Sequence, residues 1–375
     1  MPQNLLESDE DGLKELTSPD HGGEIWKESM ELGVVPNKLL DFSANVNPLG
    51  CSPLAKMAVK RSLDLVPFYP DNECTELRRA IASYVRKIEP ANIFVGNGAA
   101  EIIHLFARVF IKNGCNAIVT QPTFSEYEYA TLLQRGNPIH VMRLENFELD
   151  PEMLFKNITR RTSVLFLCNP NNPTGTVQEK EIIEKIVQEA AKSNVMVLLD
   201  ECFVDFVKGQ TKISLSSVAK KYRNLVVLRS LTKTFGLAGL RAGYAIGHEA
   251  TVRVLEKHKI TWSVNTFAQV AAIAALKDMK FLNRSFQLVR KERAFLEKSL
   301  GELGMDVTPS EANFLLARLH GQVDGEELKK RLIKRRIMIR DCSRFRGLGS
   351  RFIRLAVKTR QENEALLHAL RQELS

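Results

Sequence analysis

The sequence predicts an α/β protein with a mostly parallel central sheet, helices on both faces of that sheet, and a smaller α/β lobe. Two observations predict this class. From about residue 55 onward, short apolar runs alternate with helical patterns, which is typical of parallel strands connected by helices. After residue 265 the pattern changes to a long helical stretch and then to short strands. The 375 residues suffice for two domains, or for one large domain and a smaller lobe.

Six short apolar runs predict the buried strands of the large domain. They lie at residues 93–95, 117–119, 139–142, 164–167, 195–199 and 225–228. Helical patterns lie between several of them, for example at residues 99–110 and 179–191. In an open parallel sheet, ligands bind beyond the carboxyl ends of the strands, so we expect the functional residues in the loops that follow these runs.

The smaller lobe is predicted from a helical stretch at residues 266–301 and from strands at residues 313–317 and 352–357. The expected division is a flexible leader at residues 1–20, an amino-terminal segment at 21–55 that joins the small lobe, a large domain at 56–265 and a small domain at 266–375. Because no low-complexity linker separates the lobes, we expect them to pack together tightly.

The composition excludes several classes of protein. Apolar residues (44%) and charged residues (26%) are at ordinary levels for a soluble globular chain. No apolar run approaches about 18 residues and the amino terminus is polar and acidic, so we expect neither a membrane span nor a signal peptide. The six cysteines never form a C-x-x-C pair, which argues against a zinc knuckle or a disulfide framework, and we expect reduced thiols in the cytoplasm and no metal site.

The net charge of +9 raises the question of a nucleic-acid partner. The basic residues are spread along the chain, and the densest stretch, at residues 329–336, is better explained as the solvated face of a helix. No interleaved aromatic residues suggest base stacking. We therefore expect no nucleic-acid partner, whereas phosphorylated metabolites would suit a mildly basic protein.

The loop after the first predicted strand contains Gly96 and Gly98 at the start of a helix. Glycines let the backbone approach an anion closely, and the free N–H groups of a helix start favour phosphate. A plain tight turn explains this loop equally well. The loop after residues 164–167 reads C-N-P-N-N-P-T-G, which places asparagine donors among two rigid prolines.

Two further loops carry charged residues. Asp200 ends a wholly apolar run, where a carboxylate is costly unless it is paired, although a helix N-cap would also explain it. Lys233 lies among hydroxyls and glycines, and Arg241 follows eight positions later. A lysine in a buried site can lose its proton and attack a carbonyl, whereas a solitary lysine is usually solvated. The order of all four loops favours the chemical interpretation.

In combination, the motifs resemble the fold-type I enzymes that use pyridoxal 5′-phosphate, the aspartate aminotransferase superfamily. The matching order is N-P-N-N-P-T-G, D-E-C-F, S-L-T-K and then Arg241, and the resemblance covers nearly the whole chain after residue 20. It implies that Lys233 is the Schiff-base lysine and that Asp200 keeps the pyridine nitrogen protonated. The other implied cofactor contacts are Asn172 to the ring 3-oxygen, Phe124 stacked on the ring, and a phosphate cradle of Gly98, Ala99, Ala100, Ser230, Thr232 and Arg241.

The resemblance also implies contacts with the substrate and with a second subunit. Tyr69 is similar to a tyrosine that reaches the cofactor phosphate of the neighbouring subunit, which implies a homodimer. Arg354 is similar to the arginine that binds the substrate carboxylate in a bidentate pair, and Asn172 lies beside the same group. A binding module or a regulator that merely keeps the cofactor would leave this complete set of contacts unexplained.

Two branches of the superfamily compete, histidinol-phosphate aminotransferase and the threonine-phosphate decarboxylase of cobalamin biosynthesis. The H-G-G at residues 21–23 with L-D-F-S-A-N-V-N-P-L-G at 40–50, and R-D-C-S at 340–343, resemble the decarboxylase. Phe203 stands where these aminotransferases usually have a tyrosine. The resemblance implies decarboxylation of L-threonine O-3-phosphate, with transamination of histidinol phosphate or a related amino acid as the alternative.

In the decarboxylase interpretation, Arg340 binds the substrate phosphate with help from His21 and Asn47. A simple surface or capping role explains His21 equally well.

Overall fold

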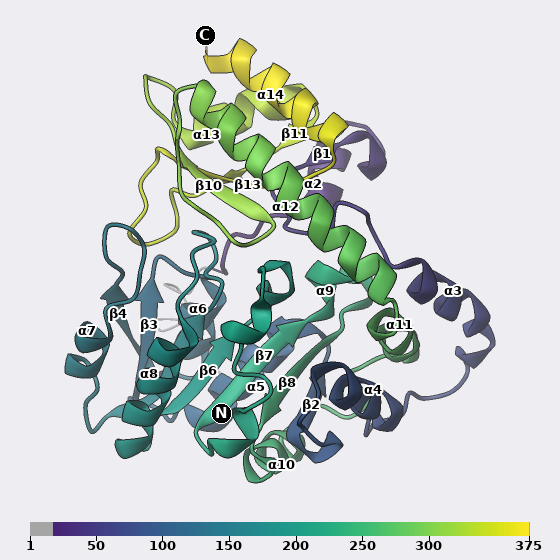
Figure 1. The fold of residues 1–375 in the computed structure, drawn as a ribbon, viewed down its shortest axis with the longest axis vertical. Coiled ribbons are helices and arrows are strands. Elements are labelled where there is room, and N and C mark those ends of the chain that lie inside the picture. Colours follow the sequence, from purple (N-terminus) through teal and green to yellow (C-terminus); the bar gives the residue numbers. More distant parts are fainter. Residues whose placement is uncertain (1–17, 375) are drawn as a thin grey trace, which may run out of the picture.

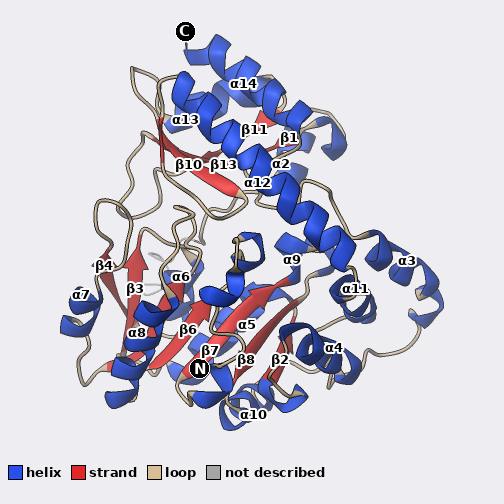
Figure 2. Cartoon of the chain, viewed as in Figure 1, coloured by secondary structure: helices blue, strands red, loops and turns tan. Residues whose placement is uncertain are grey.

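The structure, a computed structural model, describes residues 18–374. A seven-stranded sheet in the order β2-β8-β7-β6-β5-β3-β4 forms the centre of the large domain (Figures 1 and 2). Its strands are β2 (Ile93–Gly96), β3 (Asn116–Gln121), β4 (Asn137–Met142), β5 (Thr162–Cys168), β6 (Met196–Asp200), β7 (Leu225–Ser230) and β8 (Gly243–Gly247). All six predicted strands are confirmed.

Strand β8 was not predicted from the sequence, and it makes the sheet mixed. β8 lies between β2 and β7 and is antiparallel to both, whereas the pairs from β7 to β4 are parallel. Its sequence, Gly-Tyr-Ala-Ile-Gly, has only three residues with side chains larger than hydrogen, so its apolar signal is weak. All of its residues are nevertheless buried.

Helices cover both faces of this sheet, as Figure 2 shows. One face packs against α3 (Pro53–Arg61), α4 (Thr75–Val85), α8 (Lys180–Lys192) and α11 (Thr266–Leu276). The other face packs against α5 (Gly98–Phe110), α6 (Glu126–Leu133) and α10 (Glu249–Lys257). Alternate residues of β6 point into the two cores, with Val197 and Leu199 on one side and Leu198 on the other. Burial on both faces explains why the strands are continuous apolar runs.

The small domain is an antiparallel sheet in the order β12-β13-β10-β9, packed against three helices. Its strands are β9 (Asp306–Val307), β10 (Phe314–Arg318), β12 (Arg340–Asp341) and β13 (Phe352–Ala356), and its helices are α12 (Met279–Glu302), α13 (Gly325–Lys334) and α14 (Arg360–Leu374). The amino-terminal segment, drawn in purple in Figure 1, lies against this domain. After α2 (Ile25–Glu31), β1 (Leu40–Asp41) pairs in parallel with β11 (Ile337–Met338).

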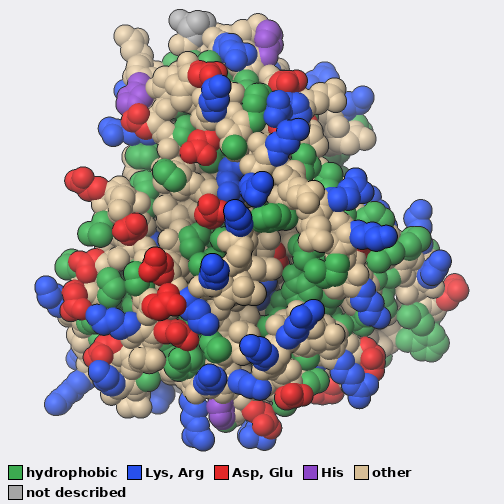
Figure 3. Space-filling view, viewed as in Figure 1, with side chains coloured by type: hydrophobic (Ala, Val, Ile, Leu, Met, Phe, Trp, Pro, Cys, Tyr) green, Lys and Arg blue, Asp and Glu red, His purple; other side chains and the backbone are tan. Residues whose placement is uncertain are grey.

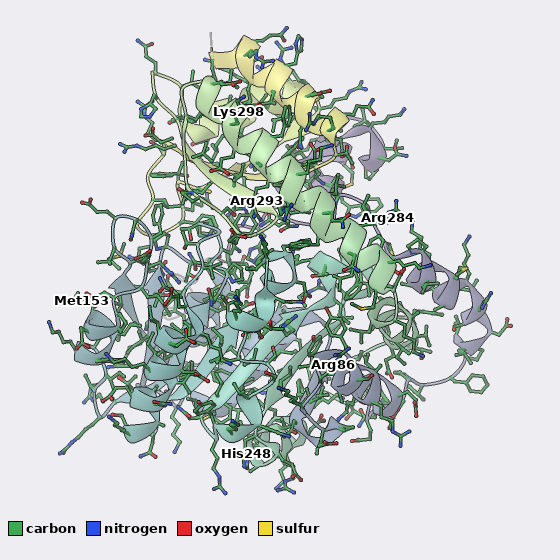
Figure 4. The ribbon with its side chains drawn as sticks, in the orientation of Figure 1. Arg86, Met153, His248, Arg284, Arg293 and Lys298 are labelled. Atoms are coloured by element: carbon green, nitrogen blue, oxygen red, sulfur yellow. The ribbon has the colours of Figure 1, made fainter. Side chains whose placement is uncertain are left out.

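The helical stretch predicted at residues 266–301 is confirmed, and the structure divides it into two helices, α11 and α12. The carboxylate of Asp278 accepts a hydrogen bond from the N–H of Phe281 at 3.2 Å and so begins α12 as a new helix. Figure 4 shows Arg284, Arg293 and Lys298 along α12 as it runs from the large domain into the small one. Arg293 donates to the carbonyl of Ala312 at 2.9 Å.

Within residues 18–374, no helix is long and apolar enough to cross a bilayer. Figure 3 shows Lys and Arg side chains scattered over the face drawn, with acidic side chains between them. Most of the predicted leader, residues 1–17, lies outside the described residues. Its last residue, Asp20, is described and packs against Arg340.

Candidate active site

A cavity of about 310 Å³ lies at the carboxyl ends of the central strands, where the small domain meets the large one. Three of the four loops that the sequence singled out line it with Asn172, Asp200 and Lys233. The fourth contributes the start of α5, through Ala99 and Ala100. The carboxyl ends of parallel strands share one edge of a sheet, and for this reason loops far apart in the sequence meet here.

Lys233 lies in the short helix α9 (Leu231–Thr234) and lines the cavity. The hydroxyl of Ser230 caps this helix by accepting a hydrogen bond from the N–H of Thr232 at 3.2 Å. Burial lowers the pKa of Lys233 to about 8, and the nearby guanidinium groups of Arg354 and Arg241 contribute to the shift. A lysine with this pKa is still mostly ammonium at neutral pH but loses its proton far more readily than an exposed lysine, so it can act as a nucleophile or exchange a proton.

The Asp200 carboxylate is held by two hydrogen bonds at the end of β6. Its Oδ1 accepts from the N–H of Cys202 at 2.9 Å, and its Oδ2 accepts from the hydroxyl of Tyr127 at 2.7 Å. Burial raises the pKa of Asp200 despite both bonds. Neither donor is a cation, so a protonated ring nitrogen placed in the cavity would supply the missing positive charge.

The start of α5 forms an anion cradle with Arg241. Gly98 has a φ of +83°, and a Cβ atom built on it would lie 2.6 Å from Nη2 of Arg241. Because residue 98 has no side chain, the guanidinium of Arg241 can lie directly against the start of α5. Ala99, Ala100, Ser230, Thr232 and Arg241 all line the cavity beside it. Free N–H groups of a helix start and a guanidinium are the donors that a phosphate requires.

Two aromatic side chains, Phe124 and Phe203, line the cavity in which we expect the cofactor ring to bind. Phe124 lines the cavity and meets Tyr127 edge to face, with ring centroids 5.7 Å apart. Phe203 also lines it and packs edge to face on Phe314 at 5.0 Å. Phe203 has no hydroxyl, so it cannot donate a hydrogen bond into the cavity.

Arg340 and Arg354 are direct partners across the antiparallel pair β12–β13, and both line the cavity. Each is only 6% exposed. Arg354 donates through Nη2 to the carbonyl of Ser43 at 2.8 Å and through Nη1 to Oδ1 of Asn172. Burial lowers the pKa of Arg354 to about 10, which leaves it charged at neutral pH. Like charges directly opposite each other destabilise a sheet, so this pair indicates a site built for anions.

His21 has two partners that were not predicted from the sequence, Glu126 and, through the same carboxylate, His104. Nε2 of His21 lies 2.5 Å from Oε1 of Glu126, and Nε2 of His104 lies 2.6 Å from Oε2 of the same carboxylate. Burial alone would raise the pKa of Glu126, but the two histidine hydrogen bonds outweigh it and lower the pKa to about 2. The ionised carboxylate thus anchors the amino-terminal segment to α6 beside Phe124, whose ring centroid is 5.3 Å from that of His21.

Two predicted site residues lie elsewhere. The amide of Asn47 donates to the carbonyl of Thr234 at 2.5 Å and to the hydroxyl of Ser285 at 2.7 Å, so it is committed outside the cavity lining. Asn45, two residues earlier, lines the cavity instead, and its buried Oδ1 has no hydrogen-bond partner among the described residues. Tyr69 is 78% exposed and stacks on Trp262 with ring centroids 4.3 Å apart.

The fold and the cavity define an enzyme of fold type I that uses pyridoxal 5′-phosphate. The cradle beside Gly98 and the buried carboxylate of Asp200, whose hydrogen-bond donors are both neutral, fit the two ends of that cofactor. The chain belongs to the family of class I and II aminotransferases, whose model matches residues 37–370.

Relatives from both expected branches are similar to this chain. A histidinol-phosphate aminotransferase of Moorella thermoacetica is 35% identical over 355 residues, covering 94% of this chain and 90% of the relative. A threonine-phosphate decarboxylase of Salmonella typhimurium is 35% identical over 365 residues, covering 96% and 98%. The crystal structure of the histidinol-phosphate aminotransferase from Clostridium acetobutylicum superposes with a TM-score of 0.83 at 31% identity, over 90% of this chain and 99% of that one. These comparisons therefore establish the family, and the two relatives from the two branches are equally similar to this chain in sequence.

Proposed function

We propose that this enzyme decarboxylates L-threonine O-3-phosphate to (R)-1-aminopropan-2-yl phosphate and carbon dioxide, a reaction of cobalamin biosynthesis. The observation that supports the proposal most strongly is the pair of buried guanidinium groups, Arg340 and Arg354, side by side on one wall of the cavity. Threonine phosphate carries a carboxylate and a phosphate, one anion for each arginine. Histidinol phosphate carries no carboxylate, so in an aminotransferase Arg354 would serve the second substrate.

We assign the substrate carboxylate to Arg354 and the substrate phosphate to Arg340. When bound, the cofactor accepts electrons from the Cα bond that stands perpendicular to its ring. Two anchors at the two ends of the substrate would fix its orientation, and this orientation selects loss of the carboxylate over loss of the Cα proton. In the proposed reaction the carboxylate leaves as carbon dioxide, and the ammonium of Lys233 then gives a proton to Cα.

Phe203 supports the decarboxylase over the aminotransferase. Aminotransferases of this group usually have a tyrosine at this position, which bonds to the cofactor 3-oxygen. The phenyl ring of Phe203 is packed against Phe314 and offers no such donor. The substitution therefore removes one contact that the alternative reaction normally uses.

We also propose that the enzyme is a homodimer in which Tyr69 reaches the partner's cofactor phosphate. The surface around Tyr69 supports this, because several large apolar side chains are exposed there: Leu63, Val66, Phe68 and Trp262. Mixing inactive Tyr69→Ala and Lys233→Ala subunits should restore activity, since each hybrid contains one intact site. Hybrids that form and remain inactive would contradict this role of Tyr69.

The test of the proposed reaction is a panel of threonine phosphate, serine phosphate and histidinol phosphate with 2-oxoglutarate. Carbon dioxide and transamination products are measured in the same samples. The proposal expects carbon dioxide and aminopropyl phosphate from threonine phosphate. Consumption of histidinol phosphate, without carbon dioxide from threonine phosphate, would establish the aminotransferase instead.

A further inference from the structure

Asp20 binds the guanidinium group of Arg340 through its carboxylate and its backbone carbonyl. Its Oδ2 lies 2.9 Å from Nη1 of Arg340, and its backbone carbonyl accepts a hydrogen bond from Nη2 at 2.6 Å. The face of the guanidinium lies over the ring of Phe345, 5.5 Å from its centroid. Both terminal nitrogens of Arg340 are thus engaged by one residue of the amino-terminal segment.

A phosphate that pairs with Nη1 of Arg340 needs the position that the Asp20 carboxylate holds. We propose that Asp20 is the resting counter-ion of Arg340 and an internal competitor of the substrate's phosphate group. This inference rests on the assignment of Arg340 to that phosphate. A buried cation without a partner is costly, so Asp20 keeps Arg340 paired until the phosphomonoester replaces it.

The geometry allows the carboxylate to leave while the neighbouring residue stays. The side chain of Arg340 is 7% exposed, but that of Asp20 is 39% exposed and can turn into solvent. His21, the next residue, is anchored separately by the Glu126 carboxylate. Release of the Asp20 carboxylate therefore frees Nη1 while the backbone carbonyl of Asp20 stays on Nη2, and the segment does not have to leave the cavity wall.

Such competition has a defined thermodynamic consequence. Every ligand whose phosphate must displace Asp20 loses the same factor in affinity, because only the fraction of enzyme with a free Arg340 can bind it. Ligands without a phosphate do not displace Asp20 and lose nothing. Asp20 therefore lowers the affinity for phosphorylated ligands alone.

The experiment is calorimetric titration of the cofactor-loaded enzyme with inorganic phosphate and with L-threonine, and for L-threonine O-3-phosphate, which is turned over, the apparent affinity is taken from its KM in steady-state kinetics. Asp20→Asn, which removes the charge and keeps the shape, should tighten both phosphorylated ligands by about three- to tenfold. The affinity for L-threonine should not change. The control is Glu24→Gln, the same charge change at an exposed position four residues along the segment, which should leave all three affinities unchanged.

A double-mutant comparison localises the effect. In an Arg340→Ala background, Asp20→Asn should no longer change the affinity for threonine phosphate. The inference is overturned if Asp20→Asn does not tighten phosphate binding, if Glu24→Gln tightens it equally, or if the effect survives without Arg340. Because inorganic phosphate is not turned over, tightening by Asp20→Asn in an enzyme that releases no carbon dioxide would reject the proposed reaction and leave this inference standing.

Discussion

Arg354 of β13 donates a hydrogen bond to Oδ1 of Asn172, which joins the small domain to the loop after β5 across 182 positions of the sequence. Its other terminal nitrogen donates to the carbonyl of Ser43. Both acceptors are neutral, so an arriving carboxylate has no ion pair to break at Arg354. Arg340, its cross-strand partner, is instead held by the carboxylate of Asp20. An anion that binds Arg354 therefore replaces only neutral acceptors, whereas an anion that binds Arg340 must replace a carboxylate.

Replacing Arg354 with lysine should reduce kcat/KM for threonine phosphate by about ten- to a hundredfold, the loss expected for a charge-assisted hydrogen bond worth roughly 1.5–3 kcal/mol. A lysine keeps the charge but cannot form the bidentate pair. Steady-state kinetics measure the loss, and cofactor absorbance shows whether the site is intact. A variant with full cofactor and unchanged kcat/KM would remove Arg354 from the carboxylate site.

Lys233→Ala should abolish the visible absorbance band that arises when the cofactor is linked to the protein. The reason is that this side chain supplies the amine that lines the cavity beside Asp200. Absorbance of the purified protein measures the band, and denaturation curves test whether the variant is folded. A normal band in folded Lys233→Ala would show that another lysine carries the link.

The lowered pKa of Lys233 predicts how the stability of the cofactor-free enzyme depends on pH. The pKa falls from about 10.5 in the unfolded chain to about 8 in the folded one, so the unfolded chain binds the proton more tightly between these values. Relative to Lys233→Met, the natural protein should be least stable below pH 8 and should recover as pH rises toward 10.5. Chemical denaturation at several pH values measures the difference. A difference that is flat across this range would mean that the ammonium is not destabilised by burial.

Glu126→Gln should raise the KM for threonine phosphate by about three- to tenfold, with less effect on kcat. His21 and His104 contact different oxygens of the Glu126 carboxylate, and an amide replaces one of these oxygens with an NH2 donor and removes the negative charge. The matched control is Glu128→Gln on the same helix, whose carboxylate pairs with Arg346 and His140 instead. If both variants behave alike, the anchoring of His21 does not contribute to substrate binding.

Tyr127→Phe should weaken cofactor binding by roughly five- to a hundredfold, the equivalent of about 1–3 kcal/mol for one unsatisfied buried acceptor. The lost donor is the hydroxyl that holds Oδ2 of Asp200. Loss of cofactor on dialysis measures the effect, and Tyr129→Phe on the same helix is the control. Equal retention of cofactor in the two variants would mean that Tyr127 does not hold the carboxylate for the cofactor.

Local sequence patterns were sufficient to predict the strands of the large domain, because the same kind of apolar run recurs along the chain. The six strands predicted from the sequence are confirmed because residues buried on both faces form uninterrupted apolar runs. Asp200 and Lys233 lie at the carboxyl ends of two of those strands. Because ligands bind beyond the carboxyl ends of parallel strands, the sequence alone predicted that these two residues lie close together. β8 escaped because two of its five residues are glycines.

The sequence by itself thus determined the fold class and the family, and it predicted that Lys233 and Asp200 lie at one site, which the shared cavity agrees with. The sequence predicted Asn47 at the site, and only the tertiary structure shows that Asn45 lines the cavity instead, because that segment has no periodicity to show which amide turns toward the cavity. The tertiary structure also decided the pairing of Asp20 with Arg340, which are 320 positions apart. Such contacts form where separate elements pack against each other, and no local pattern in either segment encodes the residue it meets.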